Sequence, residues 1–262
     1  MVDPVNKQVR RVAQLAKKDA RSETGLFLLE GVQGLKEAIE RPELIVELYV
    51  TEECFERNSS LFAKVSKAGI TFELVSDSAL KSMSDMATPQ GVLAVCKQLD
   101  VSIQTVLQKQ PRLVAFLANV RDPGNAGTVL RAADAAGADA VIFSSDSVDI
   151  YNPKVVRSTT GSLFHLDIVQ SVDIASAISQ FKAAGLAVWA ANGGGELLTS
   201  VGEDLAKPTA WVFGNEAWGF EQSTLDLVDR EVAVPLYGKA ESLNLATAAS
   251  VCLYASAMAQ RA

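Results

Sequence analysis

Three short segments in the second half of the chain carry amide, guanidinium, carboxylate and hydroxyl side chains. The first is Asn119–Arg131, the second is Val212–Glu216, and the third runs from Val234 through Glu241 to Leu245. Each begins where a short apolar run gives way to a polar loop and a helical pattern. In open α/β sheets such loops follow the carboxyl ends of the strands, where ligands bind. Together the segments predict one active site at one edge of a sheet.

The first segment combines a turn with the start of a helix. Asp122-Pro-Gly124 is typical of a turn, and a helix is expected to begin near residues 125–126. Four apolar residues are spaced to form its buried stripe: Ala126, Val129, Leu130 and Ala133. Arg131 falls off that stripe, where a guanidinium suits a phosphate or ribose ligand. The alternative is a surface ion pair with Asp134, worth about 0.2–0.5 kcal/mol.

The second segment opens a glycine-flanked loop at the end of a predicted strand. Gly214 would let a ligand approach the backbone closely. Glu216 places a carboxylate at the opening of the loop. That carboxylate could cap the following helix, accept hydrogen bonds from a substrate, or complement a cationic cofactor.

The third segment leads from a strand to the last predicted helix, over residues 243–259. Pro235 ends the strand pairing. Ser242 is a natural helix N-cap, and that role alone would explain it. Asn244 would then lie in the first helical turn, where Asn is a poor helix former. Its amide could instead hold a ribose hydroxyl or a neighbouring loop. Gly193–Gly195 is expected to be another flexible loop on the same edge, and a weaker signal.

Several other kinds of site are disfavoured. The glycine pattern of dinucleotide-binding folds, the nucleophile elbow of hydrolases and a Walker-type lysine are missing from the sequence. The single histidine, His165, lies among apolar residues and is expected to be structural rather than catalytic. The cysteines are odd in number and widely spaced, which predicts neither disulfides nor a metal site: Cys54, Cys96 and Cys252.

Composition indicates a soluble globular protein with uneven charge. Of the 262 residues, 48% are hydrophobic and 21% charged, and no stretch approaches a membrane span or a secretion signal, so a cytoplasmic protein is expected. The net charge is −7, but residues 1–21 carry six basic and two acidic side chains. This basic arm could contact phosphates. It could equally be a solvated helix face, because four apolar residues recur there at helical spacing: Val5, Val9, Val12 and Ala16.

Apolar runs predict two α/β domains. In the first, strands are expected at residues 27–29, 45–50, 70–75 and 91–96, and helices at 32–39 and 61–68. In the second, nearly all-apolar runs predict parallel strands at 113–117, 140–143, 187–190, 211–213 and 232–234. A helix is expected over 174–181, with Asp173 as N-cap. The predicted domains are residues 1–97 and 112–262, with 98–111 as a linker.

The order and spacing of the three segments resemble the signature motifs of the SpoU (TrmH-type) RNA 2′-O-ribose methyltransferases of the SPOUT superfamily. Residues 22–96, including Phe27–Gly31 and Pro89–Leu93, resemble the substrate-binding domain of two-domain members that modify large-subunit (23S) ribosomal RNA. The resemblance implies S-adenosylmethionine as cofactor, a C-terminal trefoil knot in a parallel-sheet domain, and a homodimer whose active sites form across the interface. It leaves open the modified nucleotide and a housekeeping or antibiotic-resistance role.

Site residues follow from the resemblance, position by position. Five residues match the family's catalytic set: Asn125, Arg131, Glu216, Ser242 and Asn244. Four match its cofactor-binding positions, mostly through backbone groups: Gly214, Val234, Leu236 and Leu243. No metal is implied. The alternatives are a tRNA ribose methyltransferase, a catalytically silent RNA-binding protein of the same fold, and a nicotinamide-dependent enzyme.

The resemblance also suggests a mechanism. A methyl group on a sulfonium is already an activated electrophile, so the enzyme must align a ribose 2′-hydroxyl with it and assist proton loss. A guanidinium is a poor general base because it stays protonated in proteins. Arg131 is therefore expected to bind the adjacent phosphate and stabilise the developing alkoxide, with the phosphate or a water taking the proton. Asn125 and Ser242 would orient the nucleotide.

Overall fold

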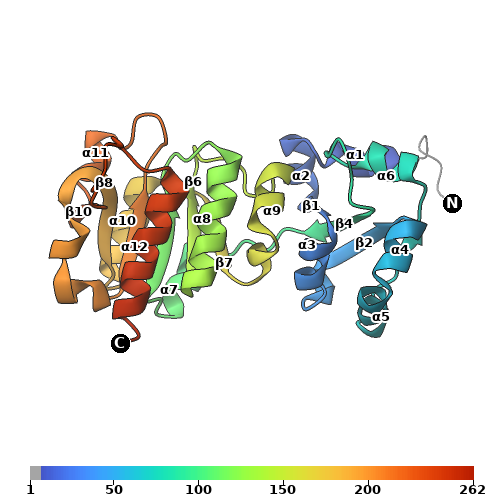
Figure 1. Cartoon of the computed structure of the whole chain (residues 1–262), viewed down its shortest axis with the longest axis horizontal. Helices are drawn as coiled ribbons and strands as arrows, with labels where there is room; N and C mark the ends of the chain where they lie inside the picture. The colour runs from blue at the N-terminus through green and yellow to red at the C-terminus, as the bar shows by residue number, and fades with distance from the viewer. Residues whose placement is uncertain (1–6) are drawn as a thin grey trace. The chain divides into compact units, whose positions relative to one another are not determined.

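The computed structural model describes residues 7–262, which fold into two compact units. The N-terminal unit comprises the residues up to Leu99 together with Tyr151–Phe164, and the C-terminal unit comprises Asp100–Ile150 and His165–Ala262 (Figure 1). Val5, expected to belong to the first apolar stripe, lies outside the described residues. No helix in the described part of the chain has the length and apolar character that crossing a bilayer requires.

The N-terminal unit is built on a four-stranded sheet in the order β1-β4-β2-β3. Strands β1 (Leu26–Glu30), β4 (Val92–Lys97) and β2 (Ile45–Val50) lie where the apolar runs predict strands. They pair antiparallel, and β3 (Glu73–Leu74) pairs with β2 in parallel. The helices are α1 (Lys7–Gln14), α2 (Lys18–Thr24), α3 (Val32–Ala38), α4 (Glu52–Arg57), α5 (Ser59–Lys67) and α6 (Asp77–Met83), with a 3-10 turn at Pro42–Leu44.

The strand predicted over residues 70–75 is shorter than expected. Only β3 pairs with β2, at the edge of the sheet. Phe72 turns instead to an aromatic cluster, with its ring 5.5 Å from that of Phe55 and 5.3 Å from that of Phe62. Packing of Phe72 in this cluster therefore overrides its strand propensity.

Helices α4 and α6 were not predicted, although Thr51 and Ser76 cap their first turns with side-chain oxygens.

The basic leading helices have both an apolar and a charged face. Three residues are buried in the core of the unit: Val9, Val12 and Leu15. Arg11 pairs with Glu47 at 2.7 Å, and Arg21 is buried, donating to the carbonyls of Leu15 and Ala16 just after α1. Four basic side chains remain exposed: Lys7, Arg10, Lys17 and Lys18. The apolar stripe and the basic surface thus coexist, with Leu15 rather than Ala16 completing the stripe.

Residues 151–164 pack with the N-terminal unit, although they lie inside the range 112–262 predicted for the second domain. They form α9 (Pro153–Thr159) and a 3-10 turn, Ser162–Phe164. The rings of Tyr151 and Phe164 lie 4.8 and 6.4 Å from that of Phe27. Arg157 donates to the buried carboxylate of Glu30 at 2.6 Å. These aromatic and ionic contacts hold residues 151–164 against the N-terminal unit. The spacing of hydrophobic residues in the sequence does not reveal such contacts.

The C-terminal unit contains a six-stranded sheet in the order β10-β8-β9-β5-β6-β7, with every pairing parallel. Its strands are β5 (Leu113–Leu117), β6 (Ala140–Ser144), β7 (Asp167–Val172), β8 (Ala187–Leu197), β9 (Thr209–Phe213) and β10 (Arg230–Ala233). Its helices are α7 (Ile103–Gln108), α8 (Pro123–Ala136), α10 (Ile174–Ala183), α11 (Gln222–Leu225) and α12 (Leu245–Ala259), with 3-10 turns at Leu198–Ser200 and Gly202–Ala206.

Helices cover both faces of the central strands. Val114 and Phe116 of β5 share a core with α7 and α10, and the alternate residues of β5 face the opposite side, where α8 and α12 pack side by side (Figure 1). The predicted apolar strands are therefore confirmed. The edge strand β7 was missed, because Asp167, Gln170 and Ser171 interrupt its apolar run. Residues 98–111, expected to be a linker, contain α7, which buries Ile103 and Val106 in this core.

One sequence expectation at the carboxyl edge of the sheet needs correction. The glycine run Gly193–Gly195 is part of β8, not a flexible loop. The pairing of β10 shifts there from Ala190 to Glu196, so the intervening residues of β8 form an irregularity and are not paired in register with β10. A Cβ at Gly195 would lie 2.3 Å from the Glu231 carbonyl. Close approach of two backbones therefore explains this glycine.

We expect Arg157→Ala to lower the free energy of unfolding by about 3 kcal/mol, because it leaves the Glu30 carboxylate buried without its cation. Far-ultraviolet circular dichroism during urea unfolding would measure this. Tryptophan fluorescence would not report unfolding of the N-terminal unit, because all three tryptophans lie in the C-terminal unit. The control is Arg57→Ala, which breaks the exposed Arg57–Glu53 pair and should cost at most about 0.5 kcal/mol. Equal effects of the two changes would contradict this account.

Candidate active site

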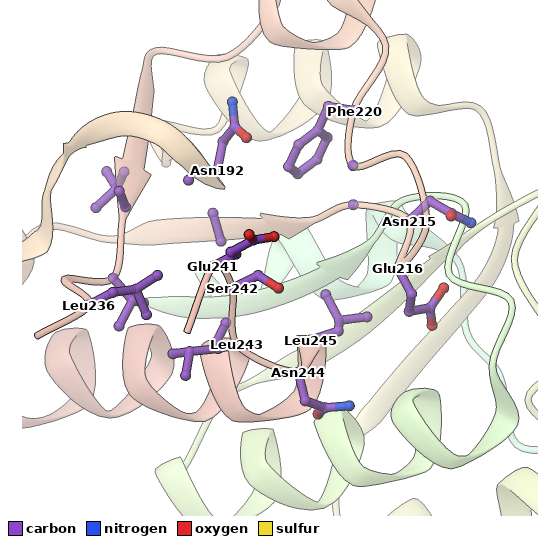
Figure 2. A pocket seen from close by; sticks show the side chains of 18 of the residues that line it. Asn192, Asn215, Glu216, Phe220, Leu236, Glu241, Ser242, Leu243, Asn244 and Leu245 are labelled. Carbon is purple, nitrogen blue, oxygen red and sulfur yellow. The ribbon is translucent and has the colours of Figure 1, made fainter. Parts of the chain in front are cut away.

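A cavity of about 630 Å³ opens at the carboxyl edge of the C-terminal sheet. Its walls come from the second half of β8, from the ends of β9 and β10 with the segments that follow them, from residues 241–248, and from α8 (Figure 2). Eight of the nine predicted site residues line it: Asn125, Gly214, Glu216, Val234, Leu236, Ser242, Leu243 and Asn244. Arg131 is the exception. Three segments far apart in sequence thus meet at one cavity, as their positions after parallel strands predict.

Glu216 joins two of these segments. Its carboxylate accepts hydrogen bonds from the backbone N–H groups of Arg121, at 3.4 Å, and Asp122, at 3.3 Å. It also accepts one from Nδ2 of Asn125, at 3.2 Å. The carboxylate therefore holds the turn before α8. The expectation that Glu216 caps the following helix is wrong, because Glu221 is the residue at the start of α11.

Asn244 joins the third segment to the first. Its Oδ1 accepts hydrogen bonds from the backbone N–H groups of Ala246, at 2.9 Å, and Thr247, at 3.3 Å, so Asn244 is the N-cap of α12. Its Nδ2 donates to Oδ1 of Asn125 at 2.9 Å. The prediction that Ser242 is the cap is wrong, since α12 begins at Leu245 and Ser242 has no hydrogen bond among the described residues. Capping of α12 thus accounts for an asparagine at position 244, a role that the sequence analysis had given to Ser242.

The glycine of the second segment is required by its own loop. Asn215 and Gly219 exchange backbone hydrogen bonds of 2.8 and 2.9 Å, which fold the loop back on itself. A Cβ at Gly214 would lie 2.6 Å from the Gly219 carbonyl oxygen. Nδ2 of Asn215 donates to the carbonyl of Asn119 at 2.7 Å and ties this loop to the first segment. The protein's own loop therefore requires glycine here, and the approach of a ligand to Gly214, which also lines the cavity, stays a prediction.

Arg131 projects from the exposed face of α8, as its position off the buried stripe predicts. Its side chain has no hydrogen bond or ion pair within residues 7–262, and it does not line the cavity. The alternative surface pair with Asp134 is not formed, because Asp134 instead contacts Nδ1 of His165 at 2.9 Å. His165 is half-exposed rather than enclosed by apolar residues, but it has the structural partner expected of it. Arg131 is free to bind an external anion.

Four cavity residues were not singled out from the sequence: Asn192, Asn215, Phe220 and Glu241 (Figure 2). Glu241 stands directly before Ser242, and Asn215 and Phe220 follow strand β9, so their positions were the available signal. Asn192 lies within β8, directly after the predicted apolar run 187–190. Glu241 forms no hydrogen bond or ion pair among the described residues. It therefore offers a free carboxylate to a cationic ligand, whereas Glu216 is occupied by three donors.

The cavity combines aliphatic walls with polar groups at one side. Val232, Leu236 and Leu243 are among the apolar lining residues. No cluster of metal-binding side chains occurs within residues 7–262. Such a cavity suits an organic ligand with an apolar ring and charged groups.

Comparison with known proteins decides the family. Residues 112–254 match the SpoU rRNA Methylase family, and residues 6–94 match the MRM3-like substrate binding domain. The chain belongs to the SpoU rRNA methylase family. The first match covers more than half of the chain, including all three segments that meet at the cavity.

Relatives of this SpoU-family chain match it over more than nine-tenths of its length. It is 33% identical to 23S rRNA (guanosine(2553)-2′-O)-methyltransferase RlmP of Bacillus subtilis, over 95% of each chain. It is 29% identical to the 23S rRNA (uridine(2479)-2′-O)-methyltransferase of Streptomyces viridochromogenes, over 92% of this chain and 86% of that one. The AdoMet-bound rRNA methyltransferase of Sinorhizobium meliloti has a similar structure, with a TM-score of 0.83, 27% identity, and coverage of 98% and 96% of the two chains.

Substitutions of Asn244 separate its two contacts. We expect Asn244→Ala to destabilise the C-terminal unit by about 1 kcal/mol, because the cap of α12 is lost. Asn244→Asp should keep the cap but lose the donor to Asn125, so its stability should stay close to the original. Thermal unfolding followed by tryptophan fluorescence would report this, because Trp211 donates to Ser256 of α12. Ser242→Ala is the control and should leave stability unchanged. A larger loss for Ser242→Ala than for Asn244→Ala would overturn the cap assignment.

Proposed function

We propose that this chain transfers a methyl group from S-adenosylmethionine to a ribose 2′-hydroxyl in 23S ribosomal RNA. The observation that carries the proposal is the cavity at the carboxyl edge of the sheet, where Glu216, Asn125 and Asn244 form a continuous hydrogen-bonded chain. Two full-length relatives carry names of 23S rRNA 2′-O-methyltransferases, and a structural neighbour is described as AdoMet-bound.

The cavity residues fit this cofactor. The aliphatic walls around Leu236 and Leu243 suit the adenine ring, and the Glu241 carboxylate suits the positive charge of the ammonium or sulfonium group. When bound, the cofactor supplies a methyl group on a positively charged sulfur, which is already activated. The protein has to orient the acceptor hydroxyl and exclude competing water.

Arg131 and Asn125 would act on the RNA side of the reaction. Asn125 lies at the cavity with its amide fixed by Glu216 and Asn244, so it can orient a nucleotide without first reorganising. Ser242 lines the same cavity with its hydroxyl free for the nucleotide. Arg131 would bind the adjacent phosphate and stabilise the alkoxide that develops as the 2′-hydroxyl loses its proton. The proton would pass to the phosphate or to water, because a guanidinium remains protonated.

The position of Arg131 supports a homodimer. Arg131 is exposed on α8, outside the cavity of its own chain. Beside α8, helix α12 exposes an apolar stripe at helical spacing: Val251, Tyr254 and Met258. Tyr254 reaches the carbonyl of Ala135 on α8, so the two helices form one surface. We propose that this surface is the dimer interface, and that Arg131 reaches the cavity of the partner chain.

The path of the last helix supports the trefoil knot that the family resemblance implies. Strand β10 lies at the edge of the sheet, but α12 returns to pack on β9 and β5 in its middle. We propose that this return closes the knot. A cytoplasmic location follows from the proposed substrate, ribosomal RNA.

The N-terminal unit would hold the RNA. It matches a substrate-binding domain and exposes four basic side chains on its leading helices, in a protein of net charge −7: Lys7, Arg10, Lys17 and Lys18. A second domain of this kind favours ribosomal RNA over tRNA as substrate. The proposed division of labour keeps residues 112–262 as the catalytic region, although residues 151–164 pack with the N-terminal unit.

The other functions are less well supported. A silent RNA-binding protein would have no use for Asn125, Glu216 and Asn244 linked at a cavity with a free carboxylate. A nicotinamide-dependent enzyme would be expected to carry the glycine-rich turn after its first strand, where this chain has Arg-Asp-Pro-Gly.

We expect Arg131→Ala to reduce methyl transfer by about a hundredfold or more while leaving cofactor affinity unchanged, because Arg131 lies outside the cavity. The assay is transfer of labelled methyl to deproteinised ribosomal RNA, with the product located by its resistance to alkaline cleavage. Cofactor affinity is measured separately by calorimetry. Arg131→Lys keeps the positive charge but not the planar guanidinium, so its rate of methyl transfer should lie between those of the wild type and Arg131→Ala. Equal loss of cofactor affinity and methyl transfer would contradict the assignment of Arg131 to the RNA side of the reaction.

A mixture of two inactive variants tests the shared site. We expect Asn244→Asp to be inactive by itself, because it loses the donor that fixes the amide of Asn125. Coexpressed Arg131→Ala and Asn244→Asp chains should recover about a quarter of the wild-type activity. Half of the randomly formed dimers are mixed, and each mixed dimer has one complete site of two. If Arg131 acts in its own chain, no site in the mixture is complete and activity stays at the level of the single variants.

A further inference from the structure

Two loops of the site carry an exposed pair of side chains that the proposed chemistry does not use. The guanidinium carbon of Arg121 lies 5.2 Å from the centre of the Trp218 ring. Trp218 is 52% exposed, whereas the other two tryptophans, Trp189 and Trp211, are buried against each other. The guanidinium of Arg121 forms no ion pair or hydrogen bond with a residue in the described part of the chain. An aromatic face and an unneutralised cation are thus presented together.

The two loops are fixed to each other, so the pair has a defined position. The backbone pair between Asn215 and Gly219 closes the loop that bears Trp218, and Oδ1 of Asn215 accepts a hydrogen bond from the N–H of Ala217. Nδ2 of Asn215 donates to the Asn119 carbonyl, two residues before Arg121. The Glu216 carboxylate accepts the N–H of Arg121 itself. The same residues that shape the cavity therefore hold this pair beside it.

The position of the pair relates it to the acceptor rather than to the cofactor. Asn215, Glu216 and Gly219 line the cavity, but Trp218 and Arg121 do not. Unpaired bases of RNA are held by stacking on aromatic side chains, and arginine adds contacts to phosphates. The pair also supplies a cation next to the cavity in a protein of net charge −7. A purely structural role would need only a buried ring, and this ring is half-exposed.

We propose that Arg121 and Trp218 bind a nucleotide next to the methylated one, with the indole stacked on its unpaired base and the guanidinium on its phosphate. This rests on the proposed function, because it names how that site holds its RNA. Both residues would be positioning residues for the acceptor ribose. They take no part in methyl transfer itself.

Kinetics of three variants test the proposal. Trp218→Ala should raise KM for deproteinised ribosomal RNA about tenfold or more, as expected for loss of one stacked base. Trp218→Phe should restore most of that loss, because it keeps an aromatic face. Arg121→Gln should also raise KM, and the effect should shrink at high salt. Arg112→Gln, at an exposed arginine directly before β5 and so at the edge of the sheet opposite the site, is the control and should change nothing. Affinity for S-adenosylhomocysteine should be the same in all of them.

Fluorescence gives a second readout that does not depend on catalysis. Because Trp218 is the exposed tryptophan, stacking of a base should quench its emission when RNA is added without cofactor. Trp218→Phe should abolish that quenching while the buried tryptophans still report an intact fold.

The outcomes separate this proposal from the proposed function. An unchanged KM for Trp218→Ala in an active enzyme would overturn the proposal and leave the methyltransferase standing. Loss of cofactor affinity and thermal stability together with RNA affinity would also overturn it, since the pair would then be structural. Absence of transfer by the wild type with every RNA would refute the proposed function. RNA-dependent quenching of Trp218 would in that case still support the binding site.

Discussion

The geometry of the site depends on one carboxylate, that of Glu216, bound to the turn before α8. Glu216 follows β9 and the turn follows β5, and these strands are neighbours in the sheet. Three donors converge on the carboxylate, two from the backbone and one from Asn125. Backbone N–H groups at the start of a helix favour a negative charge, so the contact stabilises α8 and fixes Asn125 together. Asn125 then meets Asn244, and α12 starts from that residue.

The sheet makes this arrangement possible by placing every loop of the site at one edge. Parallel strands buried on both faces leave only their ends for polar chemistry. The cavity lies where β9 and β10 end, beside the second half of β8, with aliphatic walls and a free carboxylate at Glu241. The protein is acidic overall, and Arg121 and Arg131, which have no carboxylate partner among the described residues, lie on the segments of the site as contacts for a phosphate-rich substrate.

Sequence reasoning succeeded where the signal was local. The runs around Val114 and Val188 are almost purely apolar, and only a doubly covered parallel strand buries such a run completely. Asp173 was recognised as a helix cap because its side chain bonds within its own turn. Reasoning failed where distant packing decided. Phe72 leaves its strand for an aromatic cluster, and residues 151–164 join the N-terminal unit through Phe27 and Glu30.

The sequence by itself determined the family, the parallel sheet and eight of the nine residues that were expected to share a site and that line one cavity. These depend on motif identity and on short-range periodicity, which are properties of the linear chain. Only the tertiary structure decided which partner each side chain takes. Asn244 rather than Ser242 caps α12, Glu216 binds the turn before α8 rather than the helix after it, and Arg131 lies outside its own cavity. Hydrogen bonds are short and directional, so their partners are set by the distances that folding creates between segments far apart in sequence.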